Sequence, residues 1–503
     1  MAQLSDRPHP PGDYQVVVIG SGPGGIQASY DLRRLGVRTA TLSADEKPAG
    51  MFQRFPFFQR LITWSKPYAP FERSSREYQW YDWNSLIAEE KEARGLVPQF
   101  MDGVSMFPAR EEVERATDAF VERTGLPIRF GCRWESTRRD DGDRGFVVTT
   151  SDGEYRCEAL VLAVGMSDPW VPDTPGIDKV PHYVETEDPK SYADQRVVLI
   201  GKRNSGFELA DGLEPWAREL VLISPRPARI SVIVKSTAAA RARYLQPYEE
   251  FVLGGGTYVI DAAIQNIERN SDGWQIRAHG TTRPGELTIE ADRVIAATGF
   301  QSPLGDLREL GVATFYQDRL PAQTPFWEST SVPGIYFAGT ISQGAVGLKK
   351  YGIPSNSAAV HGLRYNARVL AEHIAHVRFG ADIERRVLPP GDVAGYLLGE
   401  VTRAPELWNQ QSYLTRVLTR DELTGGLIDQ GISPLAHFVD EDGPDAIAAA
   451  VETNESGDIH PCMYLRRGGK VEEHVFEGHH MHDFTGAEQQ AQLEGLLKKV
   501  LDK

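Results

Sequence analysis

The chain has 503 residues, of which 41% are hydrophobic and 25% charged, and its formal net charge is −16. A chain of this length folds into roughly two to four domains, whose cores need no disulfide or structural metal. The negative charge argues against nucleic acid or an anionic membrane as partner, and no apolar stretch is long enough to cross a bilayer.

The first expected elements form a strand–helix–strand unit. Residues 1–13 are polar and proline-rich, without the apolar core of a signal peptide, which predicts a cytoplasmic protein. An apolar run at 15–19 reads as a strand, 25–35 as a helix and 38–42 as a second strand. This is the setting in which a glycine loop binds a dinucleotide.

The loop inside this unit has the sequence GSGPGG. Gly20 permits the tight turn, Gly22 lets the backbone approach a diphosphate, and Gly25 allows close contact between helix and strand. Pro23 follows Gly22 at the start of the helix, whose free N–H groups face the phosphates. The pattern therefore predicts a dinucleotide site.

The acid that usually binds the ribose is displaced. It should lie ~20 residues beyond the loop, at the end of the second strand. That position holds Ser43, and the nearest carboxylates, Asp45 and Glu46, come slightly later. Either the Ser43 hydroxyl binds the ribose, or one of the two carboxylates reaches back.

The middle of the chain alternates between irregular and regular segments. Residues 50–85 are rich in aromatics and proline and read as a long loop with short helices. Before the second glycine loop we expect a helix at 109–124 and strands at 127–130, 145–150 and 160–164. After it we expect strands at 256–260, 274–278, 293–297 and 332–339, and a helix at 356–375.

A second glycine loop, GKRNSG, follows an apolar run at 197–200. Gly201 and Gly206 keep the frame of a dinucleotide site, but Arg203 stands where the middle glycine belongs. A side chain there should obstruct a diphosphate, although arginine is itself a strong phosphate partner. Asn204 and Ser205 complete the loop.

Two arginines follow the next strand, at 219–223. Arg226 and Arg229 stand where an arginine usually holds the 2′-phosphate of NADP, which favours NADP over NAD. Two other interpretations remain open. The arginines could be solvated loop charges, or this unit could be a structural relic that binds its nucleotide weakly.

The tail, residues 385–503, is charged and ends in an expected amphipathic helix near 486–501. It contains His474, His479, His480 and His482, but this run lacks cysteine and a clear ligand geometry, so we predict no metal site. The tail could cap a substrate entrance, mediate a homodimer, or simply extend the fold.

The chain has three cysteines, Cys132, Cys157 and Cys462, and no two form a C-x-x-C pair. This argues against a disulfide reductase that uses such a dithiol. Buried or incidental thiols in a reducing compartment are the favoured interpretation.

Further segments resemble the flavin-containing monooxygenase family (class B), a branch of the flavoproteins that bind two dinucleotides. Residues 296–300 are similar to its linker between the NADPH and FAD domains, 334–339 to its last FAD-contacting strand, and 201–206 to its G-x-G-x-S-G loop except at Arg203. A closer resemblance is to the subgroup around FAD-dependent oxidoreductase domain-containing protein 2, which is similar to bacterial amino-acid N-oxygenases of specialised metabolism. The segments that carry it are 50–56, 60–66, 82–86 and 361–368.

The resemblance implies an α/β fold with two Rossmann-type dinucleotide-binding domains, the NADP domain being inserted into the FAD domain, followed by a C-terminal α+β extension. We expect FAD-domain parts at 1–185 and 293–380, the NAD(P)H-binding domain at 186–292 and the extension at 381–503. FAD and NADPH are the implied cofactors. The residues expected to contact them are Gly20, Gly22, Pro23, Gly25, Ser43, Phe52, Gly201, Arg203, Asn204, Ser205, Gly206, Arg226, Arg229, Thr298, Gly299, Gly339 and Thr340.

The implied activity is oxygenation of a nucleophilic atom, preferably an amine nitrogen, of a small metabolite by a flavin hydroperoxide formed from NADPH, FAD and O₂. The protein must keep water out of such a site. The stretch 52–83 is a candidate lining, although most of its rings are individually better interpreted as core. Lys66, Asn84 and Trp64 are the expected catalytic residues, and the small substrate and O₂ are the expected partners.

The sequence departs from the family at three places. The flavin-side Asn is missing near Thr63, the F-x-G-x-x-x-H signature is reduced to His182, and Thr340 replaces a common acid. Two alternatives therefore stand beside the monooxygenase. One is an FAD oxidase or dehydrogenase without oxygen transfer, and the other is a flavin-binding protein with a degenerate nicotinamide domain.

Overall fold

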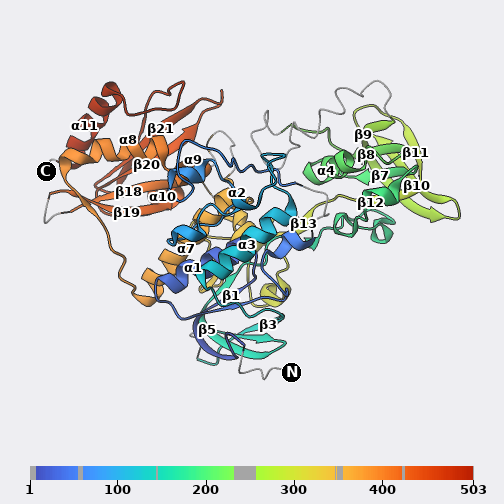
Figure 1. Cartoon of the computed structure of the whole chain (residues 1–503), viewed down its shortest axis with the longest axis horizontal. Coiled ribbons are helices and arrows are strands. Elements are labelled where there is room, and N and C mark those ends of the chain that lie inside the picture. Colours follow the sequence, from blue (N-terminus) through green and yellow to red (C-terminus); the bar gives the residue numbers. More distant parts are fainter. Residues whose placement is uncertain are drawn as a thin grey trace.

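The structure is a computed structural model that describes residues 7–54, 60–142, 145–230, 256–345, 347, 350, 355–421 and 425–501. The elements form three six-stranded sheets with their covering helices. The second and third sheets lie at opposite ends of the long axis, with the first sheet between and below them (Figure 1). No helix in these described ranges is long and apolar enough to span a membrane.

The first sheet carries the first glycine loop. Its order is β2-β1-β5-β4-β3, and β16 pairs with β5. β1, β2, β5 and β16 run parallel, whereas β3 and β4 are antiparallel additions. The strands are β1 (Gly12–Ile19), β2 (Thr39–Leu42), β3 (Trp134–Arg139), β4 (Phe146–Thr150), β5 (Gly153–Leu162) and β16 (Ile335–Phe337).

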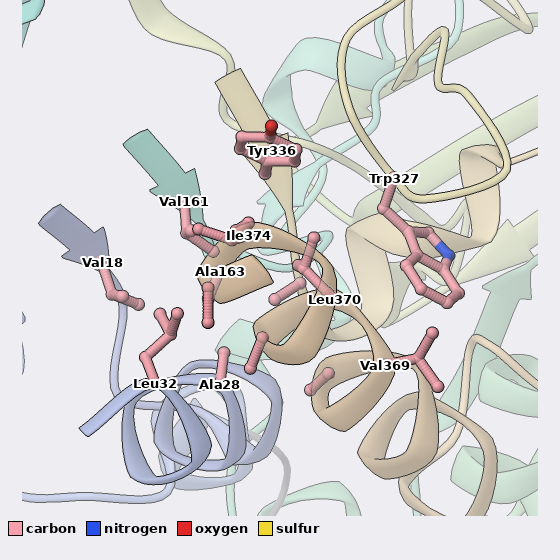
Figure 2. Packing of buried hydrophobic residues seen from close by; sticks show 14 of the residues in the cluster. Val18, Ala28, Leu32, Val161, Ala163, Trp327, Tyr336, Val369, Leu370 and Ile374 are labelled. Atoms are coloured by element: carbon pink, nitrogen blue, oxygen red, sulfur yellow. The ribbon is translucent and has the colours of Figure 1, made fainter. Parts of the chain in front are cut away.

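Two helices, α1 (Pro23–Arg34) and α7 (Val360–Phe379), cover one face of this sheet. Figure 2 shows Val18 and Val161 of the strands packing against Leu32 of α1 and Leu370 of α7. Alternate residues of β1 pack into a second core on the other face, because a buried parallel strand is apolar on both sides. The first glycine loop thus follows a strand whose last four residues, Val16 to Ile19, are buried.

The second sheet carries the second glycine loop, and its order is β11-β10-β9-β8-β7-β12. Helix α4 (Asn204–Leu213) follows β7. The chain enters after β6 (Asp168–Pro169) and returns through β13 (Phe300–Gln301), and these two short strands pair antiparallel. The sheet strands are β7 (Arg196–Ile200), β8 (Glu219–Ser224), β9 (Thr257–Asn270), β10 (Gly273–Gly280), β11 (Glu286–Ala291) and β12 (Arg293–Ala296).

The third sheet is formed by the tail and is antiparallel throughout, in the order β17-β19-β18-β20-β21-β22. β20 is buried along its whole length, because side chains of α8 and α11 pack on one face and of α10 on the other. The elements are β17 (Val387–Leu388), α8 (Val393–Arg403), α9 (Pro405–Asn409), β18 (Leu414–Arg420), β19 (Leu427–Pro434), α10 (Leu435–Asp440), β20 (Ala446–Thr453), β21 (Ile459–Arg467), β22 (Lys470–Val475) and α11 (Ala487–Leu501).

The remaining elements are short, except for the predicted helix α3. They are α2 (Val97–Phe100), α3 (Arg110–Thr124), β14 (Thr314–Phe315), β15 (Leu320–Pro321) and several 3₁₀ turns. The strand predicted at 127–130 is wrong, since Arg129 forms only an isolated bridge to Leu42. Part of the aromatic stretch, residues 55–59, lies outside the described residues.

Candidate functional site

One cavity of about 650 Å³ lies between the two glycine loops. Gly20, Gly22 and Pro23 of the first loop line it, and so do Asn204 and Ser205 at the start of α4. Phe52, Gly339 and Thr340 line it as well. The cavity therefore reaches the N-termini of α1 and α4, where free backbone N–H groups favour phosphate.

The backbone of the first loop fits the diphosphate of FAD. Gly20 has φ +116°, and a Cβ there would lie 2.4 Å from the Ala163 carbonyl oxygen. A Cβ on Gly24 would lie 2.1 Å from Gly339 Cα. Gly22, the N-cap of α1, has nothing within 4 Å of the position of a Cβ and lines the cavity. Only glycine leaves this approach open.

Asp45 is the carboxylate that lines the cavity near the expected ribose position. The Ser43 hydroxyl is already hydrogen-bonded to Ser21 Oγ at 2.7 Å, although Ser43 also lines the cavity. Asp45 Oδ1 is 2.8 Å from Arg54 Nη2, and both residues line the cavity. Glu46 is exposed and is not part of the lining.

The second loop repeats the geometry of the first except at one residue. Cβ atoms on Gly201 and Gly206 would lie 2.3 Å from Ala297 O and 2.2 Å from Gly201 O, respectively. Arg203 stands at the N-cap of α4, where Gly22 stands in the first loop, and it is exposed. The substitution thus changes the side chain at the cap and leaves the turn intact.

The neighbouring Lys202 is not available to a phosphate. Its side chain is buried, its Nζ donates to the Ile260 carbonyl at 2.7 Å, and it pairs with the Asp261 carboxylate. Arg226 and Arg229 follow β8 and are exposed, outside the cavity lining. Neither forms an ion pair within the part of the chain that the structure describes.

Thr298 and Gly299 lie in the linker between the first and second sheets, where both are hydrogen-bonded to Trp170. Thr298 Oγ1 donates to the Trp170 carbonyl at 2.6 Å, and the Trp170 N–H donates to the Gly299 carbonyl at 2.9 Å. Neither residue lines the cavity, whereas the next residue, Phe300, does. His182 is buried beside this linker, and burial lowers its pKa, so its imidazole is neutral near pH 7.

The three expected catalytic residues lie outside the cavity lining. Lys66 is exposed, with its Nζ 5.9 Å from the Tyr81 ring centroid. Trp64 stacks on Trp83 with ring centroids 3.5 Å apart. Asn84 is buried.

Asn84 holds the backbone beside the cavity. Its amide donates to the Thr63 carbonyl and to Ser65 Oγ, each at 3.1 Å, and its oxygen accepts from the Thr63 hydroxyl at 2.5 Å. Thr63 itself lines the cavity. The structure thus brings Thr63 to the site and places Asn84 behind it.

Several charged residues of the lining were not predicted from the sequence. Two of them, Arg54 and Arg60, lie in segments that carry the family resemblance, but none was assigned to the site, because the residues come from segments far apart in the chain and only folding brings them together. They are Arg54, Arg60, Arg110, Arg133, Asp168, Glu208 and Arg319. A cavity rich in arginine suits ligands that carry phosphates.

The thiols take no part in the site. Cys132, Cys157 and Cys462 are all buried and none lines the cavity. Burial raises the pKa of Cys157 to about 12 and also raises the pKa values of Cys132 and Cys462. A thiolate nucleophile is therefore disfavoured at all three positions.

The tail histidines do not gather into a ligand set among the described residues. The group there with suitable spacing for a metal is Glu452, Cys462 and Glu473. Lys350 Nζ already pairs with both of these carboxylates, at 3.0 and 2.7 Å. The lysine therefore supplies the positive charge at this position.

Three relatives share substantial parts of the chain. It is 30% identical over 226 residues to the FAD-dependent oxidoreductase domain-containing protein 2 of Danio rerio, covering 43% of this chain and 32% of the relative. It is 23% identical to the same protein of Mus musculus, covering 83% of this chain and 66% of the relative. It is 26% identical to the ferredoxin–NADP reductase of Ralstonia pickettii, covering 65% of this chain and 80% of the relative. The chain thus spans less than two thirds of either FAD-dependent oxidoreductase domain-containing protein.

Solved structures of different activity share the fold. The bacillithiol disulfide reductase of Staphylococcus aureus is 18% identical, covers 73% of this chain and 99% of its own, and has a TM-score of 0.55. The ornithine N-hydroxylase of Kutzneria sp. 744 is 15% identical, covers 73% and 100%, and has a TM-score of 0.54. These likenesses establish a Rossmann-like α/β fold.

The family model for pyridine nucleotide-disulphide oxidoreductases matches residues 17–339. This range contains both glycine loops and the linker that returns the chain to the first sheet. The chain therefore belongs to the pyridine nucleotide-disulphide oxidoreductase family and is an FAD/NAD(P)-dependent oxidoreductase.

Proposed function

We propose that this protein is an FAD-dependent, NADPH-using monooxygenase that oxygenates a nucleophilic atom, preferably an amine nitrogen, of a small metabolite. The observation that carries the proposal is one cavity that is lined by residues of both glycine loops and by none of the three cysteines. Two dinucleotides that share one cavity can exchange a hydride directly. Without a dithiol in the described lining, the electrons then need another acceptor, and O₂ is the one proposed.

Bound FAD would accept a hydride from NADPH and pass electrons to O₂; the chain's own residues bind, orient and exclude water. The Gly22 backbone and the N-terminus of α1 would hold the FAD diphosphate, and Asp45 would bind its ribose. Asn204 and Ser205 would face the nicotinamide dinucleotide. Arg226 and Arg229, near the end of β8, would hold its 2′-phosphate, which is why NADPH is preferred over NADH.

The preference for an amine rests on the sequence resemblance to amino-acid N-oxygenases, and the ornithine N-hydroxylase provides a solved example with the same fold. The fold alone does not select this reaction, because a disulfide reductase has an equally similar structure. The buried cysteines separate this chain from a reductase that works through its own dithiol.

A second candidate is an FAD oxidoreductase without oxygen transfer. It is favoured by the positions of Lys66, Asn84 and Trp64, none of which lines the cavity. The similarity to a ferredoxin–NADP reductase, which passes electrons without oxygenating a substrate, points the same way.

The two candidates differ in where the oxygen goes. The purified flavoprotein would be supplied with NADPH, ¹⁸O₂ and a panel of amino acids and diamines, and products would be analysed by mass spectrometry. The proposal predicts that one amine accelerates NADPH oxidation and gains one ¹⁸O atom. NADPH oxidation that releases only peroxide, with no labelled product from any amine, would instead support the second candidate.

A further inference from the structure

Arg319 comes from the connection after β14, outside the second sheet, and yet lies beside the second glycine loop. Its Nε donates to the Phe300 carbonyl at 3.0 Å, and its Nη2 lies 3.1 Å from where a Cβ on Gly299 would be. Gly201 packs against Ala297, two residues before Gly299. The guanidinium is therefore fixed against the linker that flanks the GKRNSG loop, and it lines the shared cavity.

Aromatic rings hold this side chain in place. The guanidinium carbon lies 4.7 Å from the Trp170 ring centroid and 5.2 Å from that of Tyr316. Stacking on aromatic rings orients arginine without neutralising its charge. Two of its N–H groups are directed to Phe300 O, whereas Nη1 makes no hydrogen bond to any residue that the structure describes.

No carboxylate in the described ranges forms an ion pair with Arg319 or with Arg203. The adjacent Asp318 is engaged elsewhere, since it accepts from the Thr314 hydroxyl at 2.6 Å and lies 3.8 Å from Arg308. Asp168 and Glu208 also line the cavity but pair with neither arginine. Burial lowers the pKa of Arg319, and the positive charge of Arg203 acts in the same direction.

Arg203 is exposed at the start of α4 and Arg319 is fixed on the adjacent linker, so the charge of one acts on the other, and neither has a carboxylate partner among the described residues. Such a pair of cations suits a doubly charged anion. We propose that Arg203 and Arg319 together clamp the diphosphate of the nicotinamide dinucleotide. The inference rests on the use of NADPH stated above and not on oxygen transfer.

The position of Arg203 selects the diphosphate over the 2′-phosphate. It is the N-cap of α4, and the N-terminus of the helix after a glycine loop is where a dinucleotide's diphosphate binds. The 2′-phosphate belongs at the end of the following strand, near Arg226. An arginine at the cap keeps the diphosphate farther from the backbone than a glycine would, and the two side chains replace the lost backbone contacts.

Variants R203Q and R319Q test the clamp by calorimetric titration of the FAD-loaded protein with NADP⁺ and with NAD⁺. Glutamine at 319 keeps a donor for Phe300 O but removes the charge. Loss of one charge-assisted contact should weaken binding of both nucleotides by roughly tenfold or more, and by the same factor for each. R283Q, at an exposed arginine of the turn between β10 and β11, is the matched control and should bind as the wild type does.

The outcomes separate the clamp from other roles of Arg319. Two results would overturn the clamp and leave Arg319 as a residue that stabilises the linker. One is that R319Q binds the nucleotides with wild-type affinity. The other is that R319Q binds them more weakly but also loses bound flavin and melts at a lower temperature. A loss confined to NADP⁺ would assign the pair to the 2′-phosphate instead. If the wild type binds neither nucleotide, both this inference and the use of NADPH fail, whereas binding without amine oxygenation leaves the clamp standing.

Discussion

Arg203 shows how one residue can change a site without disturbing its frame. The glycines that make the turn, Gly201 and Gly206, are as tightly packed as Gly20 and Gly25 in the first loop. The exchange is confined to the N-cap, where the first loop has Gly22. The second loop therefore keeps the geometry of a dinucleotide site, and the proposed clamp would contact the phosphates through side chains.

Gly24 is expected to be essential for flavin binding. In G24A, the new methyl group would meet Gly339 Cα at 2.1 Å, so α1 and the segment after β16 must separate. We expect loss of most bound FAD, measured as the ratio of flavin to protein absorbance, and destabilisation of about 1–3 kcal/mol.

G395A is the matched control for this glycine. Gly395 lies in α8 with nothing within 4 Å of a Cβ. An alanine there should retain FAD and stabilise the helix by up to about 1 kcal/mol. Equal flavin content in G24A and the wild type would contradict the close packing of the two segments.

Asn84 is expected to act through Thr63. In N84A the Thr63 hydroxyl and carbonyl lose buried partners, which should cost about 1–3 kcal/mol in chemical denaturation. Asn84 does not line the cavity, whereas Thr63 does. The KM for the amine should therefore rise no more in N84A than it rises in T63A. A larger effect on kcat in N84A than in T63A would indicate direct contact with the reacting groups.

The sequence identified those site residues whose role is carried by the backbone. Gly20, Gly22 and Gly201 could be predicted because a strand, a turn and a helix fix their positions locally. Arg319 and Thr63 could not, because their places depend on the packing of segments far apart in the chain. Ser43 stood at the expected position and lines the cavity together with Asp45, but its hydroxyl is hydrogen-bonded to Ser21.

Among the elements, α8 and α9 are joined to the loop before α2 by a network of charges. Arg76 Nη1 lies 2.7 Å from Glu400 of α8, and its Nη2 lies 2.9 Å from Glu406 of α9. Arg416 of β18 shares Glu400 at 2.7 Å. Trp80 stacks on Trp408 beside them, with ring centroids 4.6 Å apart. These contacts attach the third sheet and its helices to the rest of the molecule.

Removal of Arg76 should loosen this attachment. R76A leaves the largely buried Glu406 without its cation, and because Arg76 is itself partly exposed we expect a loss of about 2 kcal/mol in the free energy of unfolding. The exposed pair of Arg138 and Glu154, 3.7 Å apart, provides the control, because R138A should cost less than about 1 kcal/mol. Similar losses in the two variants, measured by urea denaturation, would refute the role assigned to the network.

The same network predicts a pH dependence. Burial alone would raise the pKa of Glu400, but Arg76 and Arg416 lower it to about 2, below its ordinary value of 4.5. The ionised carboxylate therefore stabilises the fold above pH 4.5, and this contribution, on the order of 3 kcal/mol, is lost as the pH falls from 4.5 towards 2. The melting temperature of E400Q should fall less steeply over this range than that of the wild type, and parallel curves would contradict the assignment.

Elements with strong periodicity were predictable, including the last helix of the tail, α11, whereas the strands of the tail were not. The first strand, α1, α3 and α7 follow clear hydrophobic patterns and were placed within a few residues. The strand expected at 127–130 failed, because this short segment meets only Leu42 and makes no ladder. The third sheet could not be predicted, because its strands do not share one alternation of apolar and polar residues. β20 is buried on both faces, whereas its sheet-mate β19 is only partly buried.

At the scale of the whole molecule, two sheets bring two glycine loops to one cavity, while the third sheet adds a body that contributes no residue to its lining. The fold hosts both disulfide reductases and N-hydroxylases. In this chain all three cysteines are buried away from the cavity. Electrons from a nicotinamide should therefore stop at the flavin until an external acceptor arrives.

Anaerobic titration of the FAD-loaded protein with NADPH tests this claim most directly. A hydride carries two electrons, so we predict that one equivalent of NADPH per flavin bleaches the flavin absorbance completely, and that NADH does so at higher concentrations. Absence of bleaching by either nucleotide would contradict direct transfer within the shared cavity. A requirement for two equivalents would show a second two-electron acceptor, such as a thiol pair, and would contradict the account equally.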